Sequence, residues 1–297
     1  MKKIIILSGI VALSALSGFA QPTQSGSILT PGVHDDFYTR EHLINRKPIP
    51  YVSIREADVM WQKRIWRVID LREKINHSLY YPIDRTSNRV ALFDVIKQGI
   101  FSRQLEAYKG DLGSAGADVH FADPKTLMTF AESVNALTEQ LLMKDSLGNP
   151  MGDSIGNPVY KPDTLNPDDI KQYFIKEDWF FDKQRSIMDV RILGIAPIIE
   201  TTDEAGQFKS YKVTFWLYYP ACRNYFTNYY CYNSYNDAEW RTYDEIFHKR
   251  LFNSYVYKET NVYDRTISVY AQGIDNLLEA EKIKDDIFKF EHDMWNF

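Results

Sequence analysis

The stretch from Ser53 to Pro82 constrains the fold most, because its apolar residues fall on two sides instead of one. At the 3.6-residue period of a helix, charged residues separate one apolar stripe from a second that lies nearly opposite. Ser53 and Glu56 have the spacing of a capping box, so the pattern predicts a helix that begins at Ser53 and ends before Pro82. The longer stripe holds Ala57, Trp61, Ile65, Val68 and Ile75, and the shorter one holds Val59, Trp66 and Ile69.

Two explanations of this two-sided helix stay open. It is either a core helix buried between two layers of the fold, or a helix that offers its second side to a partner protein. Tryptophan is a common anchor residue at protein interfaces. With the longer stripe placed inward, we expect Trp61→Ala mainly to destabilise the fold. Trp66→Ala is then expected mainly to weaken assembly with a partner.

Residues 1–20 have the three parts of a secretory signal peptide. Lys2 and Lys3 form the basic start, residues 4–16 are apolar, and a small-residue cleavage site ends at Ala20. We expect cleavage after Ala20, and therefore an exported protein. Gln21 would then come first, where a lipoprotein needs a cysteine. Without the signal, 33 Lys and Arg face 40 Asp and Glu, a net charge of −7 that argues against nucleic-acid partners.

The rest of the chain divides into four segments by composition. Residues 21–52 are rich in Pro, Gly, Ser and Thr and read as an extended arm, either a disordered leader or a segment that wraps a neighbour. Residues 53–143 read as a helical region, 144–167 as a turn-rich loop and 168–297 as a mixed region. We therefore expect an α+β fold, in which a helical N-terminal part precedes an antiparallel hairpin or sheet packed with C-terminal helices.

Individual elements follow from the local patterns. Two further helices are expected in the first half, at 91–99 and at 124–143, the second with Asp123 as its N-cap. Residues 186–199 and 208–219 are rich in β-branched and aromatic residues and predict a long β-hairpin, with 179–182 as a third strand. The C-terminal region is expected to contain a helix at 242–252, a strand at 253–258 and a final helix at 273–292.

The final helix is again two-sided. One of its sides holds Ile274, Leu277, Leu278 and Phe288, and the other holds Ala280, Ile283, Ile287 and Phe290. A surface helix of a monomer needs only one apolar side, so this pattern also indicates either a buried helix or an interaction surface.

No familiar catalytic or metal-binding pattern occurs in the chain. The six histidines do not have the spacing of a zinc site, and neighbouring acidic residues point apart on a helix or strand. An eight-residue tandem repeat at 145–160 lacks the order of a calcium loop, and its Gly-Asn-Pro triplets favour surface turns. We expect no cofactor, no bound metal, no small-molecule substrate and no enzymatic activity.

The cysteines and the tyrosines of the C-terminal half are the remaining candidates for a role. Cys222 and Cys231 either form a disulfide or remain two buried thiols. Eight tyrosines lie between Tyr211 and Tyr235, where they would pack inside a sheet, form an interface, or stack on a glycan such as peptidoglycan. The interface candidates are Val59, Trp66, Ile69, Tyr218, Tyr219, Tyr229 and Tyr230.

Six blocks of sequence, in a fixed order, resemble the GldN/PorN family of periplasmic gliding-motility and type IX secretion components. The first is the 53–82 segment, and the others are 177–198 (EDWFFDKQRSIMDVRILGIAPI), 216–223, 236–247, 258–268 and 279–295. The resemblance implies a structural role in a ring-like oligomer built with an outer-membrane lipoprotein of the GldK/PorK family. It also implies contact with inner-membrane motor components of the GldL/GldM type. The alternative is a periplasmic glycan-binding module or enzyme that uses the tyrosines of 211–235.

Overall fold

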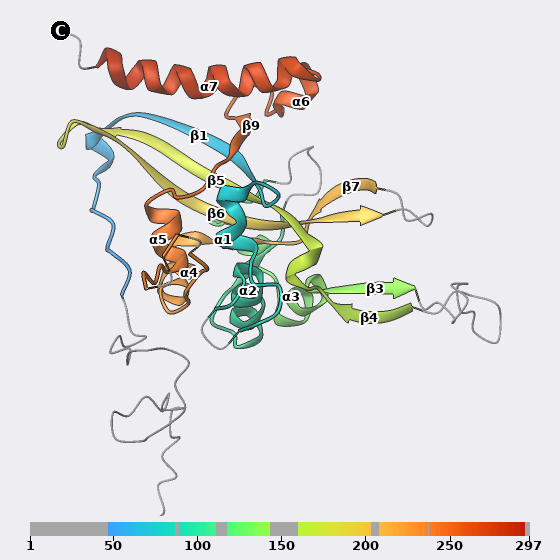
Figure 1. Ribbon diagram of the computed structural model, residues 1–297. Helices are drawn as coiled ribbons and strands as arrows, with labels where there is room; N and C mark the ends of the chain where they lie inside the picture. Colours follow the sequence, from blue (N-terminus) through green and yellow to red (C-terminus); the bar gives the residue numbers. More distant parts are fainter. Residues whose placement is uncertain are drawn as a thin grey trace, which may run out of the picture. The chain divides into compact units, whose positions relative to one another are not determined.

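An antiparallel sheet of seven strands organises the part of the chain that the structure describes (Figure 1). This computed structural model describes residues 47–86, 89–110, 118–142, 160–202, 208–233, 235–236 and 238–294, all within one compact unit. The strand order is β2-β8-β6-β5-β1-β9, and β7 pairs with β6 beside β8. The strands are β1 (Val59–Asp70), β2 (Ala107–Tyr108), β5 (Ile170–Asp182), β6 (Ile187–Thr202), β7 (Phe208–Val213), β8 (Trp216–Tyr218) and β9 (Tyr255–Glu259). A separate two-stranded sheet pairs β3 (Thr138–Leu142) with β4 (Tyr160–Thr164).

Helices cover this sheet in two groups. The larger hydrophobic core joins the sheet to α2, α4 and α5, and a smaller core joins β1 and β9 to α6 and α7. Figure 1 shows α7 running across the end of the sheet where β1 and β9 lie. The α-helices are α1 (His77–Tyr80), α2 (Leu92–Phe101), α3 (Phe130–Ala136), α4 (Tyr219–Phe226), α5 (Tyr243–His248), α6 (Ile267–Tyr270) and α7 (Ile274–Asp293). Short 3₁₀ helices lie at Glu56–Asp58, Lys74–Asn76, Pro124–Thr126 and Pro167–Asp169. The expected α+β class is confirmed.

The predicted helix at 53–82 is wrong, because its central part is the strand β1. β1 lies inside the sheet between β5 and β9, and Trp66 pairs with Lys176 on one side and Lys258 on the other. Successive residues of a strand point to opposite faces of the sheet. When both faces are covered, neighbouring positions are all buried and all apolar. Ile65, Trp66, Val68 and Ile69 are all buried for this reason. The two predicted stripes are not the two faces of β1, because Ile65 and Val68 of one stripe lie on opposite faces of the strand.

The predicted helix at 124–143 is also wrong in its extent. Asp123 does cap a short 3₁₀ helix, since its side chain accepts a hydrogen bond from the Lys125 amide. A capping box then starts α3, where Thr129 and Glu132 satisfy each other's backbone amides. The helix ends at Ala136 and the chain continues as β3. The inner capping box was the signal that the prediction overlooked.

The other elements agree better with the sequence. The hairpin of β6 and β7, the third strand β5 and the final helix are confirmed. β5 is much longer than predicted, since it begins at Ile170 and not at Trp179, and the predicted strand at 208–219 is divided into β7 and β8 before α4 begins at Tyr219. The predicted loop at 144–167 ends in the strand β4 instead. The predicted signal peptide, the arm up to residue 46 and the tandem repeat up to residue 159 lie outside the described residues.

Candidate interaction surfaces

The C-terminal helix α7 has one covered side and one exposed side. Its inner residues Ala280, Ile283 and Ile287 are buried and pack with Ile65 of β1 and Val256 of β9. Its outer residues are largely exposed, with relative accessibilities of 73% for Ile274, 61% for Leu277, 64% for Leu278 and 66% for Phe288. The predicted two-sided pattern is therefore confirmed for α7, and the outer side is a large apolar surface on the described chain.

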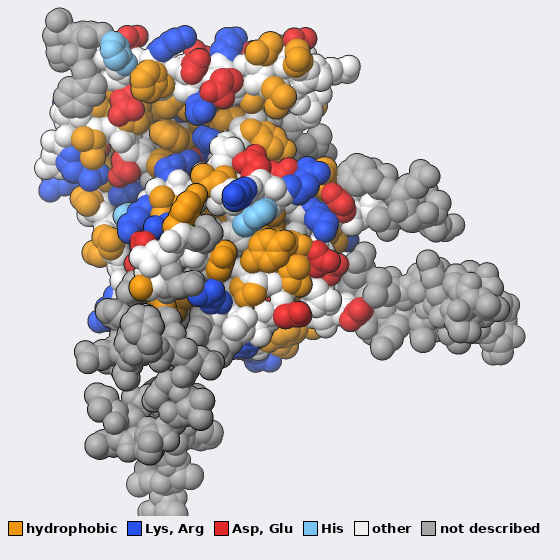
Figure 2. Space-filling view, in the orientation of Figure 1, with side chains coloured by type: hydrophobic (Ala, Val, Ile, Leu, Met, Phe, Trp, Pro, Cys, Tyr) orange, Lys and Arg blue, Asp and Glu red, His pale blue; other side chains and the backbone are white. Residues whose placement is uncertain are grey.

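The exposed surface continues next to the start of α7. Val262, Tyr263, Val269 and Tyr270 come from the loop after β9 and from α6, and all four are exposed. Figure 2 shows hydrophobic side chains along the top of the molecule, over α7 and α6, with acidic and basic side chains between them. Contiguous exposed apolar surface of this kind marks interaction sites more often than ordinary solvent-facing surface does.

A second surface lies beside α1, where the chain forms a hollow of about 700 Å³. Its apolar wall includes Ile75, Tyr81 and Leu251, which are 58%, 40% and 38% exposed. Lys74, His77 and Arg241 line it as well, and no acidic side chain is among its described lining residues. The centre of Figure 2 shows hydrophobic and basic side chains together over α1. We call this region the α1 hollow.

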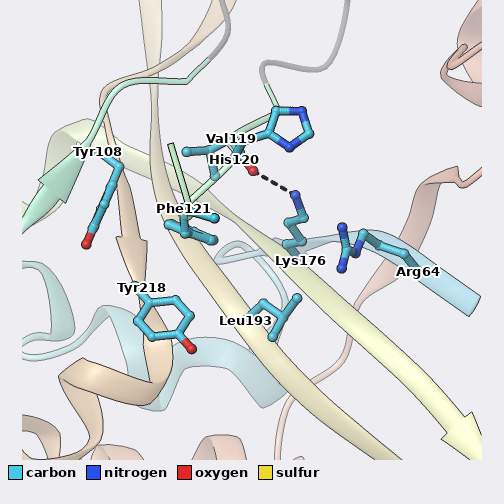
Figure 3. A pocket seen from close by; sticks show the side chains of 9 residues that line it. Arg64, Tyr108, Val119, His120, Phe121, Lys176, Leu193 and Tyr218 are labelled. Atoms are coloured by element: carbon cyan, nitrogen blue, oxygen red, sulfur yellow. Dashed lines mark hydrogen bonds between the residues drawn. The ribbon is translucent and has the colours of Figure 1, made fainter. Parts of the chain in front are cut away.

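A second hollow, of about 500 Å³, lies against β5 and β6 (Figure 3). One of its walls is aromatic, because Phe121 contacts both Tyr108 and Tyr218 at ring-centroid distances of 5.2 Å. The other wall carries the cations Arg64 and Lys176, and Figure 3 shows their side chains beside His120. The combination of aromatic rings and cations would suit an anionic or sugar-like ligand only if the cations were unpaired.

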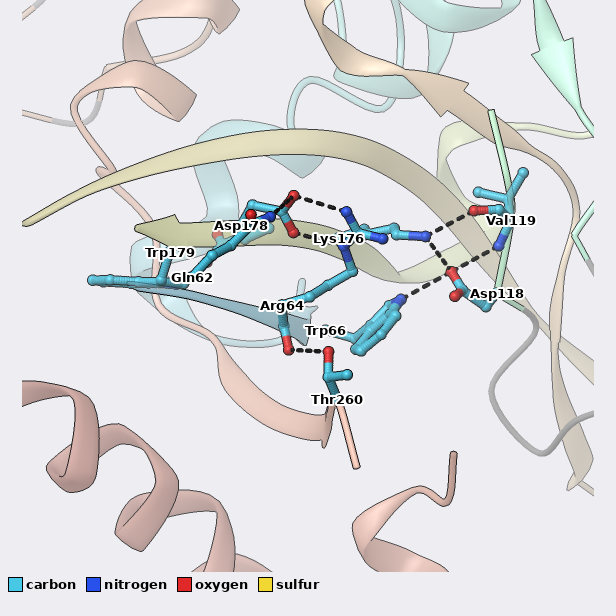
Figure 4. A network of polar contacts seen from close by, with 10 residues as sticks. Gln62, Arg64, Trp66, Asp118, Val119, Lys176, Asp178, Trp179 and Thr260 are labelled. Atoms are coloured by element: carbon cyan, nitrogen blue, oxygen red, sulfur yellow. Dashed lines mark hydrogen bonds and ion pairs between the residues drawn. The ribbon is translucent and has the colours of Figure 1, made fainter. Parts of the chain in front are cut away.

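Both cations are in fact paired with carboxylates of the chain (Figure 4). Arg64 donates two hydrogen bonds to the Asp178 carboxylate, at 2.6 and 2.8 Å. The Lys176 ammonium donates to Asp118 at 2.8 Å and to the Val119 carbonyl at 2.8 Å. Ion pairs that are already satisfied offer little further attraction to a ligand. The hollow is therefore a weaker candidate site than its lining suggests.

Trp66 is the centre of this polar network. Its indole N–H donates to Asp118 at 3.0 Å, and the ammonium groups of Lys258 and Lys176 lie 4.6 and 5.4 Å from its ring centroid. Lys258 also lies 2.8 Å from the Asp264 carboxylate. Burial raises the pKa of Asp118, but the hydrogen bond and charge of Lys176 outweigh it and hold that pKa below its usual value. Burial lowers the pKa of Lys176.

Four of the seven interface candidates lie inside the protein. Trp66, Ile69, Tyr219 and Tyr230 are all less than 9% exposed, so a partner could not reach them without a rearrangement. The remaining three, Val59, Tyr218 and Tyr229, are half-buried. Trp66 is inside because β1 is covered on both faces. The exposed side of α7 was visible in the sequence, but it was not among the named candidates.

Much of the tyrosine-rich segment belongs to the core. The Tyr219 hydroxyl donates to Asp244, and Asp244 also accepts two hydrogen bonds from Arg223, at 2.8 and 3.1 Å. All three side chains are buried. Tyr225 and Tyr229 share a hydroxyl–hydroxyl hydrogen bond of 2.9 Å. These contacts support internal packing over interface or glycan binding for this part of the segment.

Cys222 and Cys231 are not bridged in the structure. Both are buried, and the Cys231 thiol donates to the Arg241 carbonyl at 3.2 Å. Burial raises the pKa of each thiol to about 12.

Among the described residues, no group of three or more His, Cys, Asp or Glu side chains has the arrangement needed to hold a metal ion. None of the described helices combines the length and the apolar character needed to cross a bilayer.

Comparison with known families decides what kind of protein this is. A family model described as gliding motility associated protein GldN matches residues 54–296. The chain belongs to the GldN family. The match covers every strand and helix described above, from the 3₁₀ helix before β1 to the end of α7. No curated protein matches the chain. Membership of the GldN family makes this chain one of the proteins associated with gliding motility.

Proposed function

We propose that this GldN-family protein is a structural component of the type IX secretion and gliding-motility machinery. In this proposal it forms a ring-like periplasmic assembly with an outer-membrane lipoprotein of the GldK/PorK family. The observation that carries the proposal is the exposed apolar side of α7, in a chain whose family is associated with gliding motility. An assembly protein needs such surfaces, because apolar area removed from water drives most association.

The proposed location follows from the start of the chain. Residues 1–20 have the pattern of a cleaved signal peptide, and no cysteine follows the expected cleavage site. The mature protein would then lie in the periplasm and reach the outer membrane through its lipoprotein partner. Contact with inner-membrane motor components of the GldL/GldM type belongs to the same proposal.

The proposal assigns no catalytic role to the protein. The charged side chains that line the hollow of Figure 3 already form ion pairs with Asp178 and Asp118. A group that acts as a general acid or base has to be within reach of a substrate and tuned for proton transfer. Arg64 and Lys176 are held by these carboxylates, and this supports a structural role for them.

Purification from the native cells tests the proposal. A tagged mature protein should be recovered in a large complex together with an outer-membrane lipoprotein, and deletion of its gene should stop secretion of type IX cargo. The matched control is the same tag on an unrelated exported protein, expressed at the same level. Recovery of a monomer without a lipoprotein, or normal secretion in the deletion strain, would contradict the proposal.

Glycan binding is the second candidate function, and one observation favours it. Tyr108, Phe121 and Tyr218 form an aromatic wall beside a hollow, an arrangement on which a sugar ring can stack. If this role is real, the protein should sediment with purified peptidoglycan, and Tyr218→Ala should abolish the binding. Tyr229→Ala is the control, because Tyr229 lies outside that wall. Equal sedimentation of the two variants would remove this candidate.

A further inference from the structure

The outer side of α7 presents a compact apolar group at its first turn. Ile274, Leu277 and Leu278 are spaced i, i+3 and i+4, so their side chains lie together on one face of the helix. All three are more than 60% exposed. We call these three residues the α7 knob. Exposure of an apolar group of this size to water is unfavourable, and its burial against a partner lowers the free energy.

Acidic residues continue the same face beyond the knob. Glu281 follows Leu277 and Leu278 by four and three positions, and Asp285 follows Glu281 by four. Glu281 forms an exposed ion pair with Lys284 at 3.1 Å, and its charge also acts on Arg67 of β1. Over its whole length α7 holds seven acidic and three basic side chains. A surface that fits this face should therefore be concave and apolar, with positive charge at one rim.

The α1 hollow has these properties. Its volume of about 700 Å³ is within the range of cavities that bury a ligand of several apolar groups. Ile75, Tyr81 and Leu251 supply apolar walls, and Lys74 lies beside them with its side chain exposed. No described carboxylate forms an ion pair with Lys74, whereas Arg241 is paired with Glu239 at 2.8 Å. Lys74 is thus the cation that is available to an incoming acidic group.

We propose that the α7 knob of one copy docks in the α1 hollow of a second copy, with Glu281 facing Lys74 across the contact. Each copy carries both surfaces, and the two surfaces are different. A contact between unlike surfaces is heterologous, so each new copy leaves one knob and one hollow free for the next. Repetition of such a contact closes a ring when the rotation between copies allows it. The inference rests on the proposed function and specifies how its ring would grow.

Cross-linking in the native complex tests the contact directly. The mature protein would carry Leu277→Cys, Leu251→Cys or both, and cells would be treated with a short bis-maleimide before purification. The buried native thiols make the unsubstituted protein a suitable blank. We expect a ladder of covalent oligomers from the double variant and none from either single variant. Covalent dimers from Leu277→Cys alone would show a contact between like surfaces and overturn the inference.

Charge exchange provides the second arm. Glu281→Lys and Lys74→Glu should each weaken self-association about threefold to fivefold, as expected for one exposed ion pair, and the double variant should recover most of the loss. Asp286→Lys is the matched control, since it makes the same charge change on another exposed face of α7. Equal effects of Asp286→Lys and Glu281→Lys would overturn the inference.

The two proposals fail in different ways. If the lipoprotein co-purifies and the complex stays large, but the double cysteine variant gives no ladder, the knob-in-hollow contact is wrong and the ring role stands. If Glu281→Lys releases the lipoprotein instead of breaking contacts between copies, α7 is the lipoprotein's binding surface, which also overturns the inference. Failure of the unsubstituted protein to form any complex would overturn both proposals.

Discussion

The ring of Trp61 stacks on the ring of Phe290, with centroids 4.6 Å apart and planes inclined by 25°. This contact joins β1 to the last turns of α7, although the two residues stand at opposite ends of the family match. Together with Ile283 and Ile287, it fixes which side of α7 faces the sheet. The outer side, with the α7 knob, is exposed because the inner side is held in this way.

Removal of the Phe290 ring should loosen α7. Phe290→Ala is expected to lower the free energy of unfolding by about 1–2 kcal/mol, because a half-buried ring and its stacking partner are lost. Phe288→Ala is the matched control on the exposed side of the same helix, and it should change stability by less than about 0.5 kcal/mol. Denaturant unfolding of both variants measures the difference. Equal losses would mean that α7 does not pack in this orientation.

Loss of Trp66 should destabilise the fold more than loss of Trp61, which is the reverse of what the helical interpretation predicts. Trp66 is 3% exposed and central to the polar network, so Trp66→Ala should cost about 3–5 kcal/mol. Trp61 is half-buried, and Trp61→Ala should cost about 1–2 kcal/mol. Thermal unfolding of the two isolated variants compares them. A stable Trp66→Ala protein that fails only in assembly would contradict the buried position.

The pair of Asp118 and Lys176 should make stability depend on pH in acid. The pKa of Asp118 lies below its ordinary value of 3.8 in the folded protein, so this carboxylate stabilises the fold above that pH. The contribution is lost as pH falls through 3.8 toward the lower folded pKa. Lys176 is protonated in both states in this range and adds no dependence of its own.

Asp118→Asn tests this dependence. It should lower stability at neutral pH by about 3 kcal/mol, because a buried ammonium loses its partner, and it should flatten the change with pH below about 4. Asp264→Asn is the comparison, since Asp264 is an exposed partner of a buried lysine. Unfolding free energies measured between pH 3 and 7 would reveal both effects. An unchanged slope in Asp118→Asn would mean that another carboxylate produces the acid dependence.

These residues also show how far the sequence could predict the fold. The β5–β6–β7 meander was predictable, because β-branched and aromatic runs flank clear turn residues. β1 was not, because a strand covered on both faces has apolar residues at both parities and can imitate a two-sided helix. Both apolar sides of α7 were predictable, since the side chains of a helix follow its 3.6-residue period. The partner of Lys176 was not, because 58 positions separate it from Asp118. A lysine between Ile175 and Glu177 in an apolar strand was the one local hint of a buried pair.

The state of the two cysteines gives the last prediction. Buried thiols whose pKa is raised to about 12 are almost wholly protonated at neutral pH, and the thiolate is the reactive form. The native protein should therefore react very slowly with a maleimide. Unfolded in denaturant without a reductant, it should take up two equivalents, one each at Cys222 and Cys231. Mass spectrometry after alkylation counts them. Uptake of none without a reductant, and of two after reduction, would show instead that the exported protein carries the disulfide that the sequence also allowed.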